Sequence, residues 1–210
     1  MKRRNLLTLA FLVAISSPCL GKTVMSEETG QNLVFTVLVY DYAEVPGETI
    51  VQAETEATHI FRKAGVESVW LNCSHSAVEA NEPTICQKPL GPLDFVLRVI
   101  RASKTGHAAL DHCTLGFTPL EGGKGAFVTL LYDCITDLAA NRDAPPAQLL
   151  GHAVAHEIGH LFLGARHSPR GLMRARWDEG DVQLAVQRNL VFTRQQAELV
   201  RARILARMRQ

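Results

Sequence analysis

The sequence has almost no net charge, and it has no long apolar run after its first twenty residues. Lysine and arginine total 22 against 21 acidic residues, which gives a formal net charge of +1. A protein that binds nucleic acid needs a basic surplus to contact phosphates, so nucleic acid is not expected as a partner. No later segment is apolar for long enough to span a membrane, so no stable membrane span is expected.

The N-terminal segment has the pattern of a secretory signal. Basic residues at 2–4 precede a short apolar run over 6–15, and small residues follow. The apolar run is shorter than a transmembrane helix requires. We therefore expect a signal peptide over 1–21, a single domain over 22–210, and a secreted location, periplasmic or extracellular. The alternative is a lipoprotein anchored through Cys19, although the residues before it are a poor match to such a site.

Cysteine is scarce, and no two cysteines have the C-x-x-C spacing of a cysteine zinc site or a redox motif. Removal of the signal peptide would leave four cysteines. An even number in an exported chain indicates disulfides, and three pairings are open. We expect Cys73–Cys86, which closes a polar loop, and Cys113–Cys134. The alternative is four free, buried thiols.

An H-E-x-x-H sequence lies inside an apolar stretch from Leu149 to Leu163. His156 and His160 are four residues apart, so on a helix they lie one turn apart on the same face. Their ring nitrogens can converge on one Zn²⁺, and Glu157 is then placed as the general base toward a water at the metal. The alternative is a helix with two ordinary histidines. The small and apolar neighbours predict a buried helix, in which two histidines need partners, and a metal supplies them.

The residues after this helix resemble the metzincin zinc peptidases, whose pattern is H-E-x-x-H-x-x-G-x-x-H followed by a methionine turn. Here HEIGHLFLGARH runs from His156 to His167, and SPRGLM leads to Met173. The resemblance implies that His156, His160 and His167 bind Zn²⁺. It implies that Glu157 is the catalytic base and that Met173 belongs to the methionine turn, where it shapes the floor under the metal.

The chain departs from that family at one place. Three residues, rather than two, separate His160 from Gly164, so Gly164 and His167 are each shifted by one position. One extra helical residue turns the direction in which the chain leaves the helix by about 100°. His167 remains the expected third ligand because it keeps the Gly-x-x-His spacing. Three other residues with ligand side chains are the alternatives: His152, Asp178 and Glu179.

The order of predicted elements is typical of an α+β fold. Strands are expected at 33–42, 66–71, 94–102 and 126–132, with a loop over 72–92. Helices are expected at 48–64, from Pro145-Pro146 to the end of the apolar stretch, and after Thr193, which forms a capping-box pattern with Gln196. By resemblance this is a small zincin-like catalytic domain, with a mixed β-sheet, an active-site helix and a C-terminal helix.

Further predictions concern the surfaces of this domain. Residues 125–130 are expected either to form an edge strand that pairs with an extended substrate or to be an ordinary strand of the sheet. The segment 174–177 either contacts substrate through Arg174, Arg176 or Trp177, or is a solvated basic turn with a packing tryptophan. A solvated face is expected for the five arginines of the last helix: Arg194, Arg201, Arg203, Arg207 and Arg209.

The sequence therefore predicts a secreted zinc-dependent peptidase that acts on peptide or protein substrates. Two alternatives stay open. One is a catalytically degenerate, zinc-stabilised binding domain, which the shifted third histidine favours and the intact Glu157 disfavours. The other is a zinc hydrolase such as an amidase of cell-wall peptides.

Overall fold

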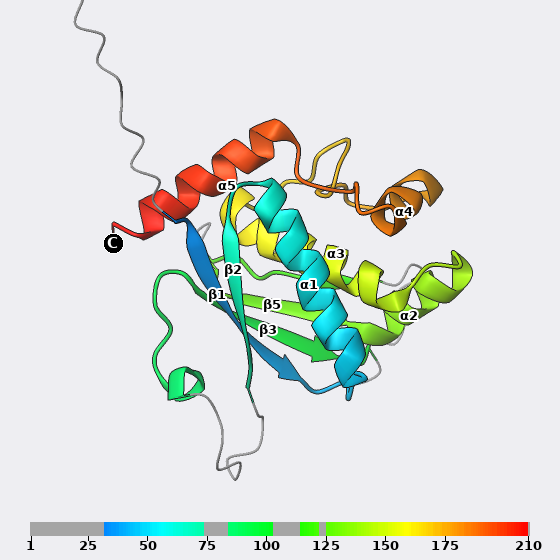
Figure 1. The fold of residues 1–210 in the computed structure, drawn as a ribbon, viewed down its shortest axis with the longest axis horizontal. Coiled ribbons are helices and arrows are strands. Elements are labelled where there is room, and N and C mark those ends of the chain that lie inside the picture. The colour runs from blue at the N-terminus through cyan, green and yellow to red at the C-terminus, as the bar shows by residue number, and fades with distance from the viewer. Residues whose placement is uncertain (1–31, 74–83, 103–113, 122–124, 210) are drawn as a thin grey trace, which may run out of the picture. The chain divides into compact units, whose positions relative to one another are not determined.

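A five-stranded mixed sheet forms the centre of the computed structural model, which describes residues 32–73, 84–102, 114–121 and 125–209. The strands run in the order β2-β1-β3-β5-β4 (Figure 1). Three neighbouring pairs are parallel, and β4 alone is antiparallel to its neighbour β5. The strand bounds are β1 Val34–Asp41, β2 Glu67–Asn72, β3 Asp94–Ile100, β4 Gly116–Phe117 and β5 Phe127–Leu131. The predicted signal peptide and Cys19 lie outside the described residues.

The four strands predicted from β-branched and aromatic runs are confirmed within two residues at each end. Alternate residues of β1 point into the core, where Phe35, Val37 and Val39 are buried. The 72–92 segment contains one short 3₁₀ helix, η1 (Thr84–Gln87), and otherwise has no regular structure in its described part. The α+β class is therefore confirmed.

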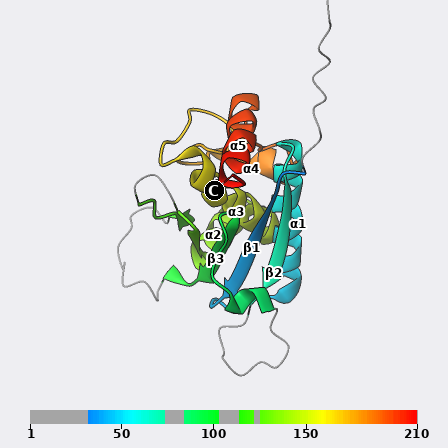
Figure 2. The same ribbon diagram turned by 90° about the vertical axis from the view of Figure 1, so that its left-hand side faces the viewer.

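Within the described residues, five α-helices accompany the sheet: α1 Gly47–Lys63, α2 Tyr132–Asn141, α3 Pro146–Leu163, α4 Glu179–Val186 and α5 Arg194–Arg207. α1 and α3 pack on the same face of the sheet (Figures 1 and 2). The ring of Phe35 on β1 contacts Phe61 of α1 at a centroid distance of 4.8 Å and Phe162 of α3 at 5.6 Å. The sequence predicted α1, α3 and α5, but it did not predict α2 or α4.

α3 is the most deeply buried helix among those described, as its apolar sequence predicts. Its residues from Leu149 to Phe162 are all buried. It also approaches α1 closely, because a Cβ on Gly151 would lie 2.6 Å from the carbonyl oxygen of Ala53. The candidate ligands therefore sit on a helix whose position is fixed by close packing on several sides.

α5 begins at the predicted capping box, in which Thr193 and Gln196 exchange side-chain and backbone hydrogen bonds. The solvated face predicted for its arginines is wrong at two positions. Arg201 donates to the carbonyl of Ala64 at 2.7 Å, and Arg207 donates to the carbonyl of Leu161 at 2.9 Å. Both side chains reach back across the domain because they leave the helix beside its buried stripe. The other three, Arg194, Arg203 and Arg209, are exposed.

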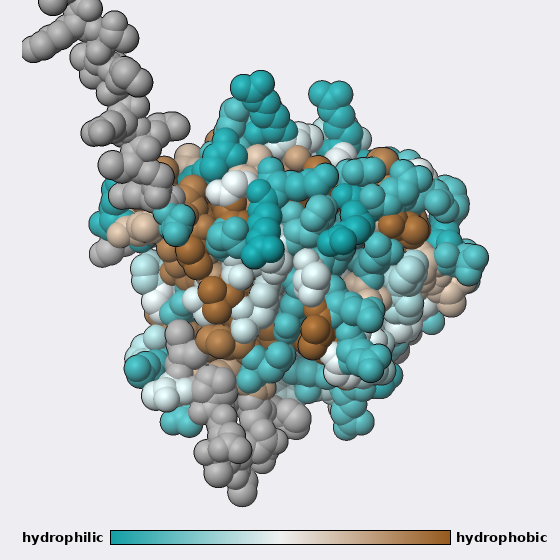
Figure 3. Space-filling model, in the orientation of Figure 1, coloured by the Kyte–Doolittle hydropathy of each residue, from teal (hydrophilic) through white to brown (hydrophobic). Residues whose placement is uncertain are grey.

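The predicted disulfide between Cys73 and Cys86 is present. Cys134 is also disulfide-bonded, and its predicted partner, Cys113, lies outside the described residues. On the face shown in Figure 3, apolar side chains gather along the outer strand β2, where Val69 is exposed, and hydrophilic side chains cover much of the helices. Over the described ranges, no helix combines the length and the apolar character needed to cross a bilayer.

Candidate metal centre

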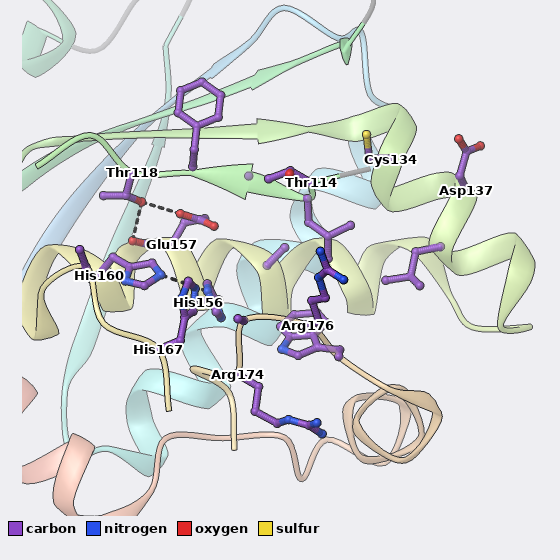
Figure 4. Close-up of a pocket in the computed structure, with 18 of the residues that line it drawn as sticks. Thr114, Thr118, Cys134, Asp137, His156, Glu157, His160, His167, Arg174 and Arg176 are labelled. Carbon is purple, nitrogen blue, oxygen red and sulfur yellow. Dashed lines mark hydrogen bonds between the residues drawn. The ribbon is translucent and has the colours of Figure 1, made fainter. Parts of the chain in front are cut away.

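Three imidazoles converge between α3 and the loop that follows it (Figure 4). His156 and His160 lie on successive turns of α3, and their Nε2 atoms are 3.1 Å apart. His167 comes from the loop, and its ring centroid lies 4.8 Å from that of His160 and 5.4 Å from that of His156. One nitrogen from each residue lies within 4.8 Å of the other two. The structure thus brings together the three residues predicted as ligands.

Hydrogen bonds to backbone carbonyls fix the two helical imidazoles. Nδ1–H of His156 donates to the carbonyl oxygen of Leu172 at 2.7 Å, and Nδ1–H of His160 donates to that of Gly164 at 2.8 Å. Because a carbonyl only accepts, the proton of each neutral ring is on Nδ1 and the lone pair is on Nε2. Two lone pairs that face each other at 3.1 Å repel, and a cation between them removes this repulsion.

This arrangement fits a zinc ion. A tetrahedral Zn²⁺ with Zn–N bonds of about 2.0–2.1 Å holds its ligand nitrogens about 3.3 Å apart, close to the observed separation of the two helical Nε2 atoms. Neutral imidazole nitrogens held by outer hydrogen bonds are also the donor set that zinc uses in catalytic sites, with one position left for water or substrate. The donor chemistry and the spacing therefore both suit Zn²⁺.

Burial keeps the helical imidazoles neutral. It lowers the pKa of His156 to about 4, with further lowering by the nearby rings of His160 and His167. Burial lowers the pKa of His160 as well. A histidine must be neutral to offer its lone pair to a metal, so both side chains are in the ligating form near neutral pH.

Gly164 explains how the chain accommodates the extra residue before the third histidine. It follows the last residue of α3 with φ +85° and ψ −175°, a backbone conformation that is essentially restricted to glycine. The chain therefore leaves the helix abruptly, and three residues later His167 faces the two helical rings. The carbonyl of Gly164 also accepts the hydrogen bond that orients His160.

Met173 is buried against the turn of α3 that carries the two histidines. A Cβ on Gly159, which lies between them in sequence, would stand 2.6 Å from the sulfur of Met173. The preceding residue, Leu172, supplies the carbonyl that orients His156. Met173 therefore packs directly against the turn of α3 that carries His156 and His160.

Glu157 lies beside the three rings, is only 7% exposed, and is contacted by Thr118. The Thr118 hydroxyl is 2.6 Å from Glu157 Oε2 and 2.9 Å from the backbone carbonyl oxygen of the same residue. Burial raises the pKa of the Glu157 carboxyl to about 7, and the hydrogen bond from Thr118 opposes this rise. A buried carboxyl that exchanges its proton near neutral pH is suited to general acid–base work.

Of the two roles expected for residues 125–130, an edge strand that pairs with substrate or an ordinary strand of the sheet, the sheet pairing favours the ordinary strand. Thr129 and Leu130 of β5 pair with β3 on one side and with β4 on the other, so β5 has no free edge there. The outermost strand on this side is β4, among the residues described. β4 lies directly over the carboxyl of Glu157, because a Cβ on Gly116 would stand 2.9 Å from Cγ of Glu157.

A cleft of about 750 Å³ opens beside the three histidines and is lined by β4, α2, α3 and the segment 174–177. Trp177 forms part of its wall, with its ring centroid 6.0 Å from that of His156. The indole N–H donates at 3.2 Å to the carbonyl of Leu172, which also accepts from His156. Arg174, Arg176 and Trp177, for which either substrate contact or a solvated basic turn was expected, all line this cleft. Trp177 also packs inside the domain, as the second expectation requires.

The alternative ligands are engaged elsewhere. Asp178 caps α4 and forms an ion pair with Arg174, and Glu179 forms an ion pair with Arg142. His152 is fully buried one turn before His156, and its Nδ1–H donates to the carbonyl of Gln148 at 2.8 Å. The structure does not bring these three side chains into the group formed by His156, His160 and His167.

Comparisons with known proteins find similar solved structures. No protein-family model and no curated protein sequence matches the chain. A zinc-dependent peptidase from Methanocorpusculum labreanum is similar with a TM-score of 0.51 and 14% identity, over 79% of this chain and 99% of that one. Archaemetzincin from Methanopyrus kandleri gives a TM-score of 0.48 and 16% identity, over 82% and 97%. The first of these likenesses shows that the two chains share a fold.

Proposed function

We propose that this chain is an exported zinc-dependent peptidase of the metzincin kind. His156, His160 and His167 bind Zn²⁺, and Glu157 is the general base. The observation that carries the proposal is the convergence of three imidazoles beside a buried carboxyl, with two rings fixed so that their lone pairs face one point. The fold shared with a zinc-dependent peptidase supports the same assignment.

Bound Zn²⁺ supplies polarisation of a carbonyl group and acidification of a coordinated water. Glu157 accepts the proton of the attacking water on a carboxylate oxygen and passes it to the nitrogen of the leaving amine, so that the carboxylate is regenerated. The Thr118 hydroxyl holds Oε2 of Glu157 and thereby limits rotation of the carboxylate. The outer edge of β4 offers backbone hydrogen bonds to an extended peptide.

Export is part of the proposal. The basic and apolar N-terminal pattern supports a signal peptide over 1–21, and the disulfide between Cys73 and Cys86 suits an oxidising compartment. In that setting the substrates are peptides or proteins outside the cytoplasm.

Hydrolysis of an unfolded protein by the zinc-loaded enzyme tests the proposal. We expect turnover that a chelator removes and that one equivalent of zinc restores. Glu157→Gln should keep its zinc and lose at least about 100-fold in kcat, because the isosteric amide cannot accept the proton. Arg170→Ala, which removes an exposed side chain outside the cleft, is the matched control and should keep full activity.

Three outcomes would contradict the proposal in different ways. Activity in zinc-loaded Glu157→Gln would exclude this residue as the base. Stoichiometric zinc without cleavage of any peptide would favour a binding domain. Cleavage restricted to amides of cell-wall peptides would favour the amidase alternative.

A further inference from the structure

Arg176 is the one cationic side chain of the cleft, histidines aside, that has no ion-pair or hydrogen-bond partner among the described residues. The cleft is lined by four acidic or basic side chains besides its histidines: Asp137, Glu157, Arg174 and Arg176. Arg174 is held by Asp178 and Asp181, and Glu157 by Thr118. The guanidinium of Arg176 therefore remains available to a ligand in the cleft.

Figure 4 shows where this guanidinium lies. Arg174 and Arg176 come from the same loop but point in opposite directions: Arg174 points away from α3, and Arg176 points toward Thr114 at the start of the β4 segment. In the same view Arg176 lies on the α2 side of the three histidines. The carboxylate of Asp137 points away from Arg176 at the far end of the cleft.

The pairing of β4 indicates which part of a substrate reaches Arg176. β5 runs directly into α2 at Tyr132, and β4 is antiparallel to β5, so the β4 segment starts at the α2 end. The hydrogen bond from Leu131 N–H to the carbonyl of Leu115 fixes that end. A peptide that adds antiparallel to the outer edge of β4 runs in the direction of β5. Its residues after the scissile bond therefore extend toward α2 and pass Arg176.

A guanidinium recognises a carboxylate through two parallel N–H···O hydrogen bonds. We infer that Arg176 binds a substrate carboxylate on the C-terminal side of the scissile bond, so that the enzyme selects acidic residues or a free chain end there. The inference rests on the proposed peptidase function and names its substrate class. It makes Arg176 a specificity-determining residue that contacts substrate but takes no part in proton transfer.

Matched fluorogenic peptides test this inference. Aspartate, asparagine and lysine are placed in turn at each of the first three positions after the scissile bond, and each peptide is made with a free or an amidated C-terminus. Cleavage gives kcat/KM, and binding to zinc-loaded Glu157→Gln protein gives Kd without turnover. The proteins compared are the wild type, Arg176→Ala, Arg176→Glu and the control Arg170→Ala.

We expect the wild type to prefer a carboxylate over its amide by about 10- to 100-fold at one position. A preference for the aspartate side chain identifies an acidic residue as the ligand, and a preference for the free C-terminus identifies the chain end. Arg176→Ala should lose this preference, so that its kcat/KM falls more on the carboxylate peptides than on the matched neutral peptides, and Arg176→Glu should turn the preference toward lysine. Arg170→Ala should keep the wild-type preference.

Equal kcat/KM for acid and amide peptides in an active wild type would overturn the inference and leave the peptidase function standing. An equal loss on acidic and neutral peptides in Arg176→Ala would also overturn it, because it would show a merely structural role. If no peptide is cleaved but carboxylate-dependent binding is lost in Arg176→Ala, the role of Arg176 stands and the peptidase function falls.

Discussion

The hydroxyl of Thr118 is the polar group that the described structure places on the side chain of Glu157. Thr118→Val keeps the shape of the side chain and removes this hydrogen bond. We expect a fall of about tenfold in kcat with unchanged zinc content, because the carboxylate loses a fixed orientation and about 1 kcal/mol of hydrogen-bond energy. Steady-state kinetics with metal analysis measure this effect.

Thr118→Ser supplies the control, since it restores the hydroxyl without the methyl group. It should recover most of the kcat that Thr118→Val loses. If valine and serine variants have equal activity, or if both lose zinc, Thr118 acts on the structure and does not position the base.

The burial of Glu157 has a consequence for stability that does not require metal. Its pKa rises from 4.5 to about 7, so the folded state holds a proton that the unfolded state releases between these values. The stabilisation from that proton is complete below pH 4.5 and is lost as the pH rises through 7. In zinc-free protein, Glu157→Gln should therefore be more stable than the wild type at pH 8, by at most about 3 kcal/mol.

Urea unfolding of both zinc-free proteins at pH 8 and pH 4.5 measures the difference. At the lower pH the two should differ by less than about 0.5 kcal/mol, because the carboxyl is then neutral in the folded state and half neutral in the unfolded state, whose pKa is 4.5. Buried histidines are common to the two proteins and cancel in the comparison. If the difference in unfolding free energy between the two proteins were the same at both pH values, Glu157 would not be desolvated.

Single residues of the site were predictable where spacing alone brings them together. His156, Glu157 and His160 belong to one helix, and its period places the two imidazoles together. His167 was predictable from its distance to Gly164, although the reason that it reaches the site is the backbone conformation of that glycine. Thr118 was not predictable, because it lies 39 positions before Glu157 in the sequence and only the packing of the β4 strand against α3 brings them together.

Arg207 is one of two arginines, with Arg201, that hold the last helix, α5, against the domain. The Arg207 guanidinium donates to the carbonyl of Leu161 and lies over the rings of Phe95 and Phe162, 5.1 and 5.8 Å from their centroids. Arg207→Ala should lower the free energy of unfolding by about 1–2 kcal/mol through loss of the hydrogen bond and the ring contacts. Urea denaturation measures the change.

Arg203→Ala is the matched variant, since it removes an exposed arginine from the same helix. It should change the unfolding free energy by no more than about 0.5 kcal/mol. If the two substitutions lowered the unfolding free energy equally, the effect would come from the charge of the helix and not from the contacts of Arg207 with the rest of the domain.

The elements that the sequence failed to predict are short or closely joined to others. α2 starts directly after β5, with no glycine or proline between them. The sequence therefore gives no sign of where the strand ends and the helix begins. β4 has only two residues, too few for an alternating pattern. α4 had a readable signal, because Asp178 and Asp181 form its capping box, but the second position is aspartate where the usual pattern has glutamate or glutamine.

The fold of the described domain was predictable in class and in the order of its main elements. Its β-branched strands and its amphipathic α1 have the hydrophobic period of the structure they form, and the buried α3 is a continuous, mostly apolar run between a proline pair and a glycine. The order of strands in the sheet was not predictable, because the pairing of β4 with β5 depends on contacts distant in sequence. That pairing makes β4, and not residues 129–130 of β5, the outer strand on this side of the described sheet.

Zinc K-edge X-ray absorption on protein loaded with one equivalent of zinc measures the proposed metal centre directly. We predict three imidazole nitrogens at about 2.0–2.1 Å in the wild type and two in His167→Ala. Failure of the wild type to hold stoichiometric zinc, or a ligand shell that His167→Ala leaves unchanged, would contradict the convergence of these three histidines on one ion.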